Sequence, residues 1–238
     1  PGQRVLDIGC GWGGMALYLA RAADVSVHGI TLSEEQYALA SRRAEEAGVS
    51  DRVSFEIIDY RLLAEREPQG FDRIVSVGMF EHVGQPQFDT FFEKADKLLK
   101  SNGIMLLHTI GRFGEPGMTD AFTRKYIFPG GYIPALSEIA VASQKSGLIV
   151  SDVETLRLHY GWTIRHWYER TVANRDRIVA MYDERFYRMW LFYLSGAGAA
   201  FLWGGMGNFQ LQYVKNRHAL PPTRDYMIAR EAEYLAIG

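Results

Sequence analysis

A short apolar run that ends near a carboxylate and enters a glycine-rich turn constrains this chain more than any other feature. Residues 4–8 read Arg-Val-Leu-Asp-Ile, and residues 9–14 read Gly-Cys-Gly-Trp-Gly-Gly before a helical pattern opens at Met15. Strand, glycine turn and helix form the arrangement in which backbone N–H groups and a helix N-terminus face a nucleotide-like ligand. Glycines allow the backbone angles of such a turn and let a ligand approach the main chain. The stretch therefore predicts an α/β fold with a ligand site at this turn.

The carboxylate of Asp7 helps to separate two kinds of ligand. Gly9, Gly11 and Gly14 also satisfy the G-x-G-x-x-G spacing of dinucleotide folds. A dinucleotide places its pyrophosphate at this turn, where a nearby carboxylate repels an anion and attracts a cation. The run D-I-G-C-G-W-G-G resembles the first motif of class I S-adenosylmethionine-dependent methyltransferases, whose cofactor carries an ammonium and a sulfonium. The cofactor-binding residues expected here are Asp7, Gly9, Gly11 and Gly13. The alternative for Asp7 is a carboxylate that caps the following helix.

The first half of the chain alternates strand-like and helix-like segments. Strands are expected at residues 4–8, 25–30, 53–58, 71–77 and 104–108. Helices are expected at residues 15–23, 34–47 and 86–99. This alternation predicts a doubly wound, mainly parallel sheet whose ligands bind beyond the carboxyl ends of the strands. Ser33 and Gln36 predict a capping box at the second helix, and Asn102-Gly103 predicts a turn before the fifth strand.

The regular alternation of strand-like and helix-like segments ends after His108. Residues 111–133 hold glycine, proline and aromatic residues without a clear period, which is typical of a lid or binding element. Helices are then expected at 134–145 and 160–187, and strands at 149–156 and 209–214. Residues 189–214 carry no formal charge but five glycines, which favours a buried helix, a glycine turn and a strand over a membrane span. The predicted fold class is α/β, a doubly wound, mainly parallel seven-stranded sheet with helical lid insertions.

Charge and cysteine content limit the partners. The net charge of −2 argues against a nucleic-acid binder. Residues 1–111 hold 11 Lys and Arg against 16 Asp and Glu, whereas residues 112–238 hold 15 against 12, so the second half is the side expected to face anionic lipid head groups. Cys10 is the single cysteine, which fits a reducing compartment. Because the chain opens at Pro1 and enters a core strand almost at once, we expect one catalytic domain over residues 1–238 with its N-terminal segment missing.

Polar residues follow the second and third predicted strands. Thr31, Leu32 and Gln36 follow the second, where a hydroxyl and an amide can bond ribose hydroxyls or simply cap a helix. Asp59 and Tyr60 follow the third, where an adenine could stack on the ring and bond the carboxylate. A structural turn aspartate is an equal alternative there. All five residues are expected to contact the cofactor.

Glu81 and His108 form the candidate catalytic pair. Both fall at the carboxyl ends of predicted neighbouring strands, so both should point into one crevice ahead of the lid segment. Two ionisable groups that converge in this way are typical of acid–base catalysis. Only two candidate ligands are evident, so no metal site is expected.

Longer blocks resemble cyclopropane-fatty-acyl-phospholipid synthases. They are residues 6–14, 29–33, 59–61, 71–84, 107–111, 125–131, 167–170 and 192–194. The most specific are S-V-G-M-F-E-H-V-G at 76–84 and H-T-I-G at 108–111. The resemblance covers essentially the whole chain and implies the class I methyltransferase fold. The family also places a cysteine near its catalytic ion, in a segment that would precede residue 1.

The resemblance implies transfer of a methylene unit from S-adenosylmethionine to a cis double bond in a phospholipid acyl chain. The alkene attacks the sulfonium methyl, and the resulting carbocation must lose a proton. Members of the family bind a bicarbonate ion as the base, held by the matches to Glu81, His108, the main chain of Ile110 and Tyr193. Bicarbonate can donate its proton to a carboxylate while its other oxygens accept from His and Tyr. Tyr126 and Phe128 are expected near the cation, and Trp167 in core packing.

The implied partners are unsaturated phospholipid acyl chains at the membrane surface, with peripheral association at the cytoplasmic inner face and no nucleic acid. A homodimer stays open. Three alternatives remain: a related enzyme that gives a methyl-branched or oxygenated lipid, a lipid- or cofactor-binding protein without turnover, and an NAD oxidoreductase, which Asp7 disfavours.

Overall fold

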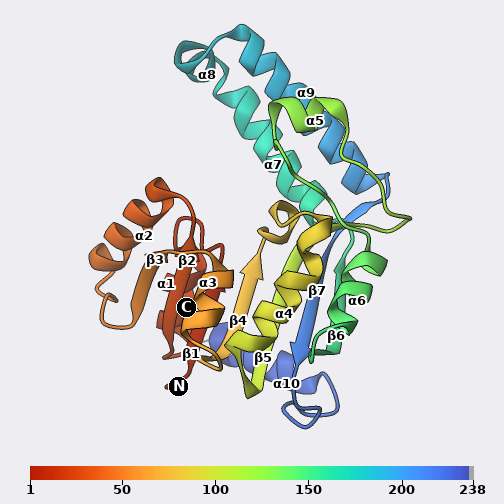
Figure 1. Cartoon of the computed structure of the whole chain (residues 1–238). Helices are drawn as coiled ribbons and strands as arrows, with labels where there is room; N and C mark the ends of the chain where they lie inside the picture. The colour runs from red at the N-terminus through yellow and green to blue at the C-terminus, as the bar shows by residue number, and fades with distance from the viewer. Residues whose placement is uncertain (236–238) are drawn as a thin grey trace.

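Seven strands form one sheet in a computed structural model of the protein, which describes residues 1–235 (Figure 1). The strands are β1 (Arg4–Ile8), β2 (Ser26–Thr31), β3 (Val53–Ile57), β4 (Phe71–Val77), β5 (Leu99–Arg112), β6 (Ile149–Leu156) and β7 (Met206–Val214). Their order across the sheet is β3-β2-β1-β4-β5-β7-β6. The first five are parallel, whereas β7 runs antiparallel to β5 and β6. The predicted doubly wound, mainly parallel seven-stranded sheet is confirmed.

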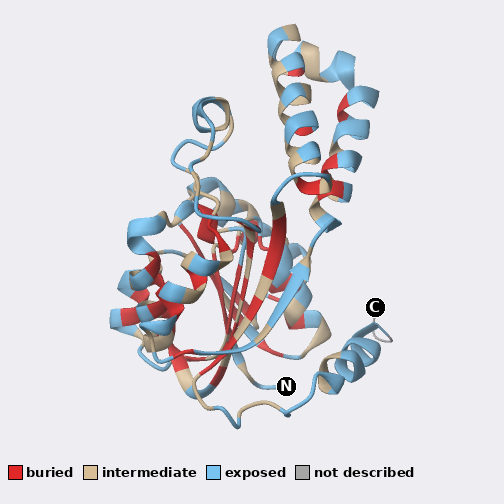
Figure 2. Ribbon diagram, turned by 90° about the vertical axis from the view of Figure 1, so that its right-hand side faces the viewer, coloured by how far each residue is buried: buried red, intermediate tan, exposed pale blue. Residues whose placement is uncertain are grey.

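Helices cover both faces of this sheet and bury two separate cores. They include α1 (Gly14–Ala22), α2 (Glu34–Glu46), α3 (Tyr60–Arg66), α4 (Phe88–Leu98) and α6 (Leu136–Gln144). Helices α1 and α2 pack on a valine-rich face of the sheet, while α3, α4 and α6 pack on an aromatic one. Figure 2 shows the buried residues concentrated on the strands and on the helix sides that meet them. Burying each large apolar side chain contributes roughly 1.5–3 kcal/mol.

Helix α4 illustrates why this sequence folds onto a sheet. Its buried residues are Phe88, Phe91, Phe92, Ala95 and Leu98. Spacings of three and four residues place them on one stripe of the helix. That stripe packs on the sheet, and it brings Phe80, which follows β4, into stacking distance of Phe88 at 4.3 Å between ring centroids. The turn after β4 is thereby fixed to the core.

Three expectations for the first half are wrong. Helix α3 was not expected; it starts because Oδ1 of Asp59 accepts a hydrogen bond from the Arg61 amide at 2.8 Å. Strand β5 begins at Leu99 rather than at residue 104, so Asn102-Gly103 lies inside the strand, where its pairing with β4 shifts register. The capping box at α2 is half formed, since Ser33 accepts from the Gln36 amide but the Gln36 side chain accepts from the Thr31 hydroxyl instead.

The lid segments contain more helices than expected. Residues 111–133 include α5 (Ala121–Tyr126), and the expectation that residues 160–187 are largely helical is confirmed. This region consists of α7 (His159–Ala173), α8 (Arg175–Met181) and the start of α9 (Glu184–Leu202), which Asp183 caps by accepting from the Phe186 amide at 2.6 Å. Helices α7, α8 and α9 form a hairpin that projects beyond the sheet, with α5 beside it (Figure 1). The predicted helical lid insertions are confirmed.

Helix α9 is followed by a glycine turn and β7, as expected, but the helix is not buried. Its buried residues are Tyr187, Leu194 and Phe201, whereas Phe192 is 65% exposed. The apolar sequence of α9 therefore faces partly into solvent rather than into a core (Figure 2). Within residues 1–235, no helix has both the length and the apolar character needed to cross a bilayer. Helix α10 (Asp225–Leu235) was not expected from the sequence, and it buries no residue.

Candidate active site

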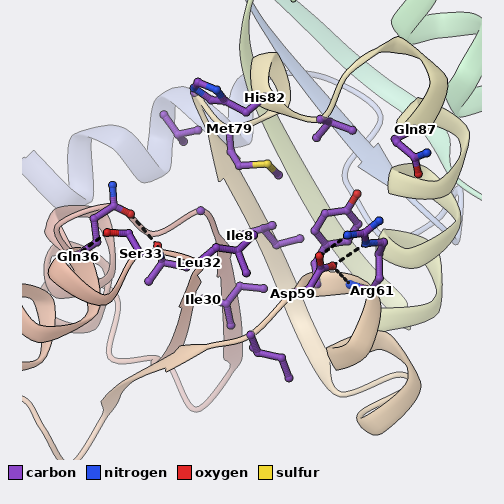
Figure 3. Close-up of a pocket in the computed structure, with 18 residues that line it drawn as sticks. Ile8, Ile30, Leu32, Ser33, Gln36, Asp59, Arg61, Met79, His82 and Gln87 are labelled. Carbon is purple, nitrogen blue, oxygen red and sulfur yellow. Dashed lines mark hydrogen bonds and ion pairs between the residues drawn. The ribbon is translucent and has the colours of Figure 1, made fainter. Parts of the chain in front are cut away.

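A cavity of about 650 Å³ lies at the carboxyl ends of β1, β2 and β4. We call it the glycine-turn cavity. Of the expected cofactor-binding residues, its lining includes Gly9, Gly11, Thr31, Leu32, Gln36, Asp59 and Tyr60. Figure 3 shows Ser33 and Gln36 on one side of this cavity and Asp59 with Arg61 on the other. Strand order reverses between β1 and β4, and that is where doubly wound sheets bind their ligands.

The glycine turn forms part of the cavity wall. Gly9 and Gly11 have φ angles of 79° and 53°, in the left-handed region that favours glycine. A Cβ on Gly9 would lie 2.6 Å from the side chain of Met79, while one on Gly11 would meet open space. Gly13 does not line the cavity: a Cβ there would lie 2.8 Å from Phe55. Gly11 therefore offers its main chain to a ligand, and Gly13 allows close packing between α1 and its neighbours.

Asp7 lies directly behind this turn. Its side chain is 2% exposed, and its Oδ2 has no hydrogen-bond partner within residues 1–235. Burial raises the pKa of the Asp7 carboxyl to about 7. Asp7 does not cap α1, whose N-cap residue is Gly13 and which has no side-chain cap, so that alternative is wrong. The structure thus holds a poorly solvated carboxylate behind the cavity wall rather than in the lining itself.

The Thr31 side of the cavity is a small polar network. The Thr31 hydroxyl donates to Oε1 of Gln36 at 2.7 Å, which leaves the Gln36 amide nitrogen as a donor. Leu32 lies beside them with most of its side chain exposed. On the other side, Arg61 donates to both carboxylate oxygens of Asp59 at 2.9 and 2.6 Å, and this ion pair lowers the pKa of Asp59. The cavity therefore presents neutral donors on one side and a fixed ion pair on the other.

Glu81 lies on a 3-10 turn, Phe80–His82, that follows β4. The Ile110 amide donates to its Oε1 at 2.7 Å, while its Oε2 is buried without a partner among the described residues. The side chain is 8% exposed, and burial raises its pKa. Glu81 lines a smaller cavity of about 220 Å³, which shares Gly78 and His82 with the glycine-turn cavity. This Glu81 cavity therefore adjoins the first.

His108 contacts a residue that the sequence analysis missed. Its Nε2 lies 2.9 Å from the side-chain amide nitrogen of Asn208, which comes from β7. Because that amide can only donate, the ring accepts at Nε2 and, when neutral, carries its proton on Nδ1. Burial lowers the pKa of His108, which favours this neutral form. Asn208 is itself buried.

Tyr193 lies on α9 and lines a third cavity of about 380 Å³, the apolar cavity. Its walls come mainly from α5 and α9, with Phe122, Phe192, Ala197 and Phe201 among them. Burial raises the pKa of Tyr193 to about 12. Tyr160 lines both this cavity and the Glu81 cavity, and its pKa is raised by burial and secondarily by the charge of Glu81. Tyr160, which the sequence analysis did not identify as a site residue, therefore lies between Glu81 and Tyr193.

The structure brings together only part of the expected catalytic set. Glu81 and the Ile110 amide are in direct contact, but within residues 1–235 no hydrogen bond joins Tyr193 to Glu81 or His108. Of the expected aromatic residues, Phe128 lines both the Glu81 cavity and the apolar cavity. Tyr126 is half exposed, and Trp167 packs with Tyr160 in the hairpin core as expected.

Six shared lining residues join the Glu81 cavity to the apolar cavity. They are Ile110, Thr119, Thr123, Phe128, Ile133 and Tyr160. The Glu81 cavity shares Gly78 and His82 with the glycine-turn cavity. The order is thus a cavity at the glycine turn with polar groups on two of its sides, a buried carboxylate, and an apolar cavity under the hairpin. Such a series suits a polar cofactor at one end and a hydrocarbon chain at the other.

Comparison with known proteins identifies relatives over most of the chain. The family described as "Mycolic acid cyclopropane synthetase" matches residues 1–211. Cyclopropane-fatty-acyl-phospholipid synthase of Escherichia coli (strain K12) is 46% identical over 201 residues, which is 84% of this chain and 50% of that protein. A "Probable fatty acid methyltransferase" of Pseudomonas putida is 40% identical over 238 residues, covering 95% of this chain and 59% of that one. The chain spans about half the length of these curated relatives.

A solved structure agrees with the fold. The crystal structure of mycolic acid cyclopropane synthase CmaA1 complexed with SAH and CTAB superimposes with a TM-score of 0.80. It is 31% identical in sequence, and the match covers 90% of this chain and 78% of that one. The seven-stranded sheet and its helical insertions are therefore those of a class I methyltransferase fold.

Proposed function

Because the chain belongs to the mycolic acid cyclopropane synthetase family, we propose that it transfers a methylene unit from S-adenosylmethionine to the cis double bond of an unsaturated phospholipid acyl chain. The product is a cyclopropane ring. The observation that carries this proposal is the series of adjoining cavities, in which the Glu81 cavity shares lining residues with both the glycine-turn cavity and the apolar cavity. A cofactor at the glycine turn and an acyl chain under the hairpin would then meet at Glu81.

The glycine-turn cavity fits S-adenosylmethionine. The open main chain at Gly11, the donor on Gln36 and the unpartnered carboxylate of Asp7 suit a ligand with hydroxyls and positive charge. Tyr60 and Asp59 would face the adenine. The CmaA1 complex with SAH, the demethylated form of this cofactor, supports the assignment. When bound, the cofactor would supply the electrophilic one-carbon unit.

The environment of Glu81 suits a bound bicarbonate as general base. Burial raises the pKa of Glu81 and leaves its Oε2 without a hydrogen-bond partner among the described residues. Both features favour a neighbour that donates a hydrogen bond to Oε2, and the O–H of bicarbonate can do so. The Ile110 amide already donates to Oε1 of Glu81, so the main chain of Ile110 would hold the Glu81 carboxylate in place. His108 would donate from Nδ1 and Tyr193 from its hydroxyl. Together these residues would hold the base beside the carbon that loses its proton.

The apolar cavity is the proposed acyl-chain site. Most of its wall is aliphatic or aromatic and would not bind a charged head group. Arg112 and Asp120 are the charged residues in its lining. Phe128 and Tyr160 would present ring faces to a developing carbocation, which stabilises positive charge. The CmaA1 structure holds CTAB, a long-chain cationic detergent, which supports an alkyl site in this fold. Access from a membrane surface on the cytoplasmic side is part of the proposal.

A second product remains a candidate because the same residues serve both outcomes. If the proton leaves from another carbon, the product is a methyl-branched chain rather than a ring. The Pseudomonas putida relative, described as a probable fatty acid methyltransferase, supports this alternative. The distinction lies in the product and not in the cofactor.

Lipid mass spectrometry tests the proposal. The protein is incubated with S-adenosylmethionine and vesicles that contain a monounsaturated phospholipid. We expect a gain of one CH₂ with the original double bond consumed; because the methyl-branched alkene has the same mass, ozonolysis before mass spectrometry tells the two apart, and cleavage at a retained double bond would establish the methyl-branched alternative. Decarbonated buffer should slow turnover, and added bicarbonate should restore it. Full activity in decarbonated buffer, with protein shown free of carbonate, would leave Glu81 or His108 as the direct base. Absence of any cofactor-dependent product would overturn the enzyme assignment.

A further inference from the structure

The hairpin of α7, α8 and α9 has a free end. Helix α8 and the turns on either side of it lie at the point of the hairpin farthest from the sheet (Figures 1 and 2). Residues 174–183 at this end are exposed or half-buried, with none fully buried. We call residues 170–188 the hairpin tip. Within residues 1–235 no other element covers it.

The tip carries arginines without carboxylate partners. Arg175 pairs with Asp176 and Glu184, and Asp183 caps α9. The four remaining arginines form no ion pair with any residue in 1–235 and are exposed; they are Arg170, Arg177, Arg185 and Arg188. The acidic side chains of the tip thus form contacts within the tip, while four arginines face solvent.

Apolar side chains stand among these cations. Met181 and Tyr182, at the turn between α8 and α9, are 63% and 62% exposed. Tyr182 stacks on Phe186 at 4.3 Å between centroids, which orders the ring without covering it. An exposed aromatic and thioether pair surrounded by arginines matches the interface of an anionic bilayer, where apolar groups enter the head-group region and arginines meet phosphates.

We propose that the hairpin tip docks on an anionic phospholipid bilayer, with Met181 and Tyr182 in the interface and the four free arginines on head-group phosphates. This deepens the proposed function and rests on it, because α9 continues from the tip to the wall of the apolar cavity at Tyr193 and Ala197. The acidic half of the chain, residues 1–111, forms the opposite part of the molecule. A negatively charged surface would therefore orient the protein with the tip toward the lipid.

Vesicle sedimentation with matched charge variants tests the docking surface. Arg177→Gln with Arg185→Gln removes two tip charges. The control, Arg21→Gln with Arg217→Gln, removes two exposed charges that also lack ion pairs but lie outside the hairpin. On vesicles with phosphatidylglycerol, the tip variant should partition about 10–30-fold less than the native protein, since each basic residue near such a surface contributes about fivefold. The control should change less than about threefold. Equal losses in both variants would overturn the proposal.

A fluorescent label tests insertion directly. Tyr182→Cys provides an exposed thiol, whereas the native Cys10 is buried. An environment-sensitive probe on residue 182 should shift to the blue with phosphatidylglycerol vesicles and not with phosphatidylcholine vesicles. A label at Arg21→Cys should not respond. No shift at residue 182 would contradict docking through the tip.

Two further measurements separate this proposal from the proposed function. Tip variants should bind S-adenosylmethionine and turn over detergent-dispersed lipid like the native protein. Loss of vesicle turnover alone then supports docking. If the native protein binds anionic vesicles through the tip but gives no product in vesicles or detergent, the enzyme assignment fails while the docking surface stands.

Discussion

The amide nitrogen of Asn208 lies 2.9 Å from Nε2 of His108, across the antiparallel strands β7 and β5. The contact connects a titratable ring to a buried residue that cannot change its charge. It sets the orientation of the imidazole and leaves Nδ1 to carry the proton. Through Asn208, the position of His108 depends on β7, a strand that enters the sheet after the whole hairpin.

Asn208→Ala should therefore impair turnover without affecting the cofactor. Loss of an orienting partner of this kind typically costs about 10–100-fold in activity. We expect a fall of that size in kcat with the Kd for S-adenosylmethionine unchanged, measured by lipid product formation and calorimetry. Gln212→Ala is the matched control, because Gln212 is also on β7 but lies opposite Leu106, and its side-chain oxygen accepts from the hydroxyls of Ser151 and Tyr226. An equal effect of the two substitutions would show that β7 matters only for stability.

Glu81→Gln should reduce turnover more severely. The amide keeps an oxygen for the Ile110 N–H but cannot accept a proton from the base, so a loss of about 10²–10⁴-fold is expected if proton removal limits the rate. Cofactor affinity should stay near normal. Glu138→Gln is the control, a half-buried carboxylate that accepts from Tyr132 and the Ala135 amide instead. Unchanged turnover in Glu81→Gln would exclude Glu81 from proton removal.

Asp7 should make the stability of the cofactor-free protein depend on pH. Its pKa is about 7 when folded and about 3.8 when unfolded, so between these values the folded state holds a proton that the unfolded state lacks. The stabilisation that Asp7 contributes is complete below pH 4 and is lost as pH rises through 7. Asp7→Asn should thus gain stability relative to the native protein, on the order of 2–4 kcal/mol at pH 8 and little at pH 4. Urea unfolding at both pH values measures the difference. A constant difference would mean that Asp7 is ionised throughout.

Filling the apolar cavity should alter lipid preference. Ala200 lines the cavity, whereas its neighbour Ala199 faces solvent on the same helix. Ala200→Phe should lower kcat/KM for phospholipids at least about tenfold, with a larger effect for longer acyl chains, because the added ring takes space that the chain would occupy. Ala199→Phe should leave both unchanged. The cofactor Kd serves as the check that the glycine turn is intact. Uniform losses across chain lengths would place the acyl chain elsewhere.

The sheet could be predicted because its signals are local. Residues 4–8 and 71–77 are short β-branched runs bounded by turn residues, and the structure places strands over both ranges. The prediction that helix α9 is buried is wrong, because an uncharged segment is buried only if another element covers it. Here its apolar residues face a cavity and solvent instead. The largely helical region expected at 160–187 is present, but its breaks at Asn174 and Asp183 were not predicted, because the aromatic and arginine pattern obscured them.

The candidate site residues likewise fall into those that a local sequence signal marks and those that it does not. The motif predicted residues of the glycine turn and of the β2 end as cofactor-binding, and most of them line one cavity. Tyr160 and Asn208 were missed because each is an ordinary residue in its own segment. Their importance arises from tertiary contacts with Glu81 and His108, and single positions in a sequence carry no signal for such contacts.

Strands β6 and β7 are hydrogen-bonded neighbours, with Leu156 opposite Asn208. Residues 157–205 therefore leave the sheet and return to it at adjacent points. A segment whose ends already meet can be lengthened, shortened or replaced at small entropic cost to the rest of the domain. In evolutionary terms the hairpin is an exchangeable module. Under the proposed function, a change in this one insertion would alter the choice of lipid while the cofactor-binding strands stay unchanged.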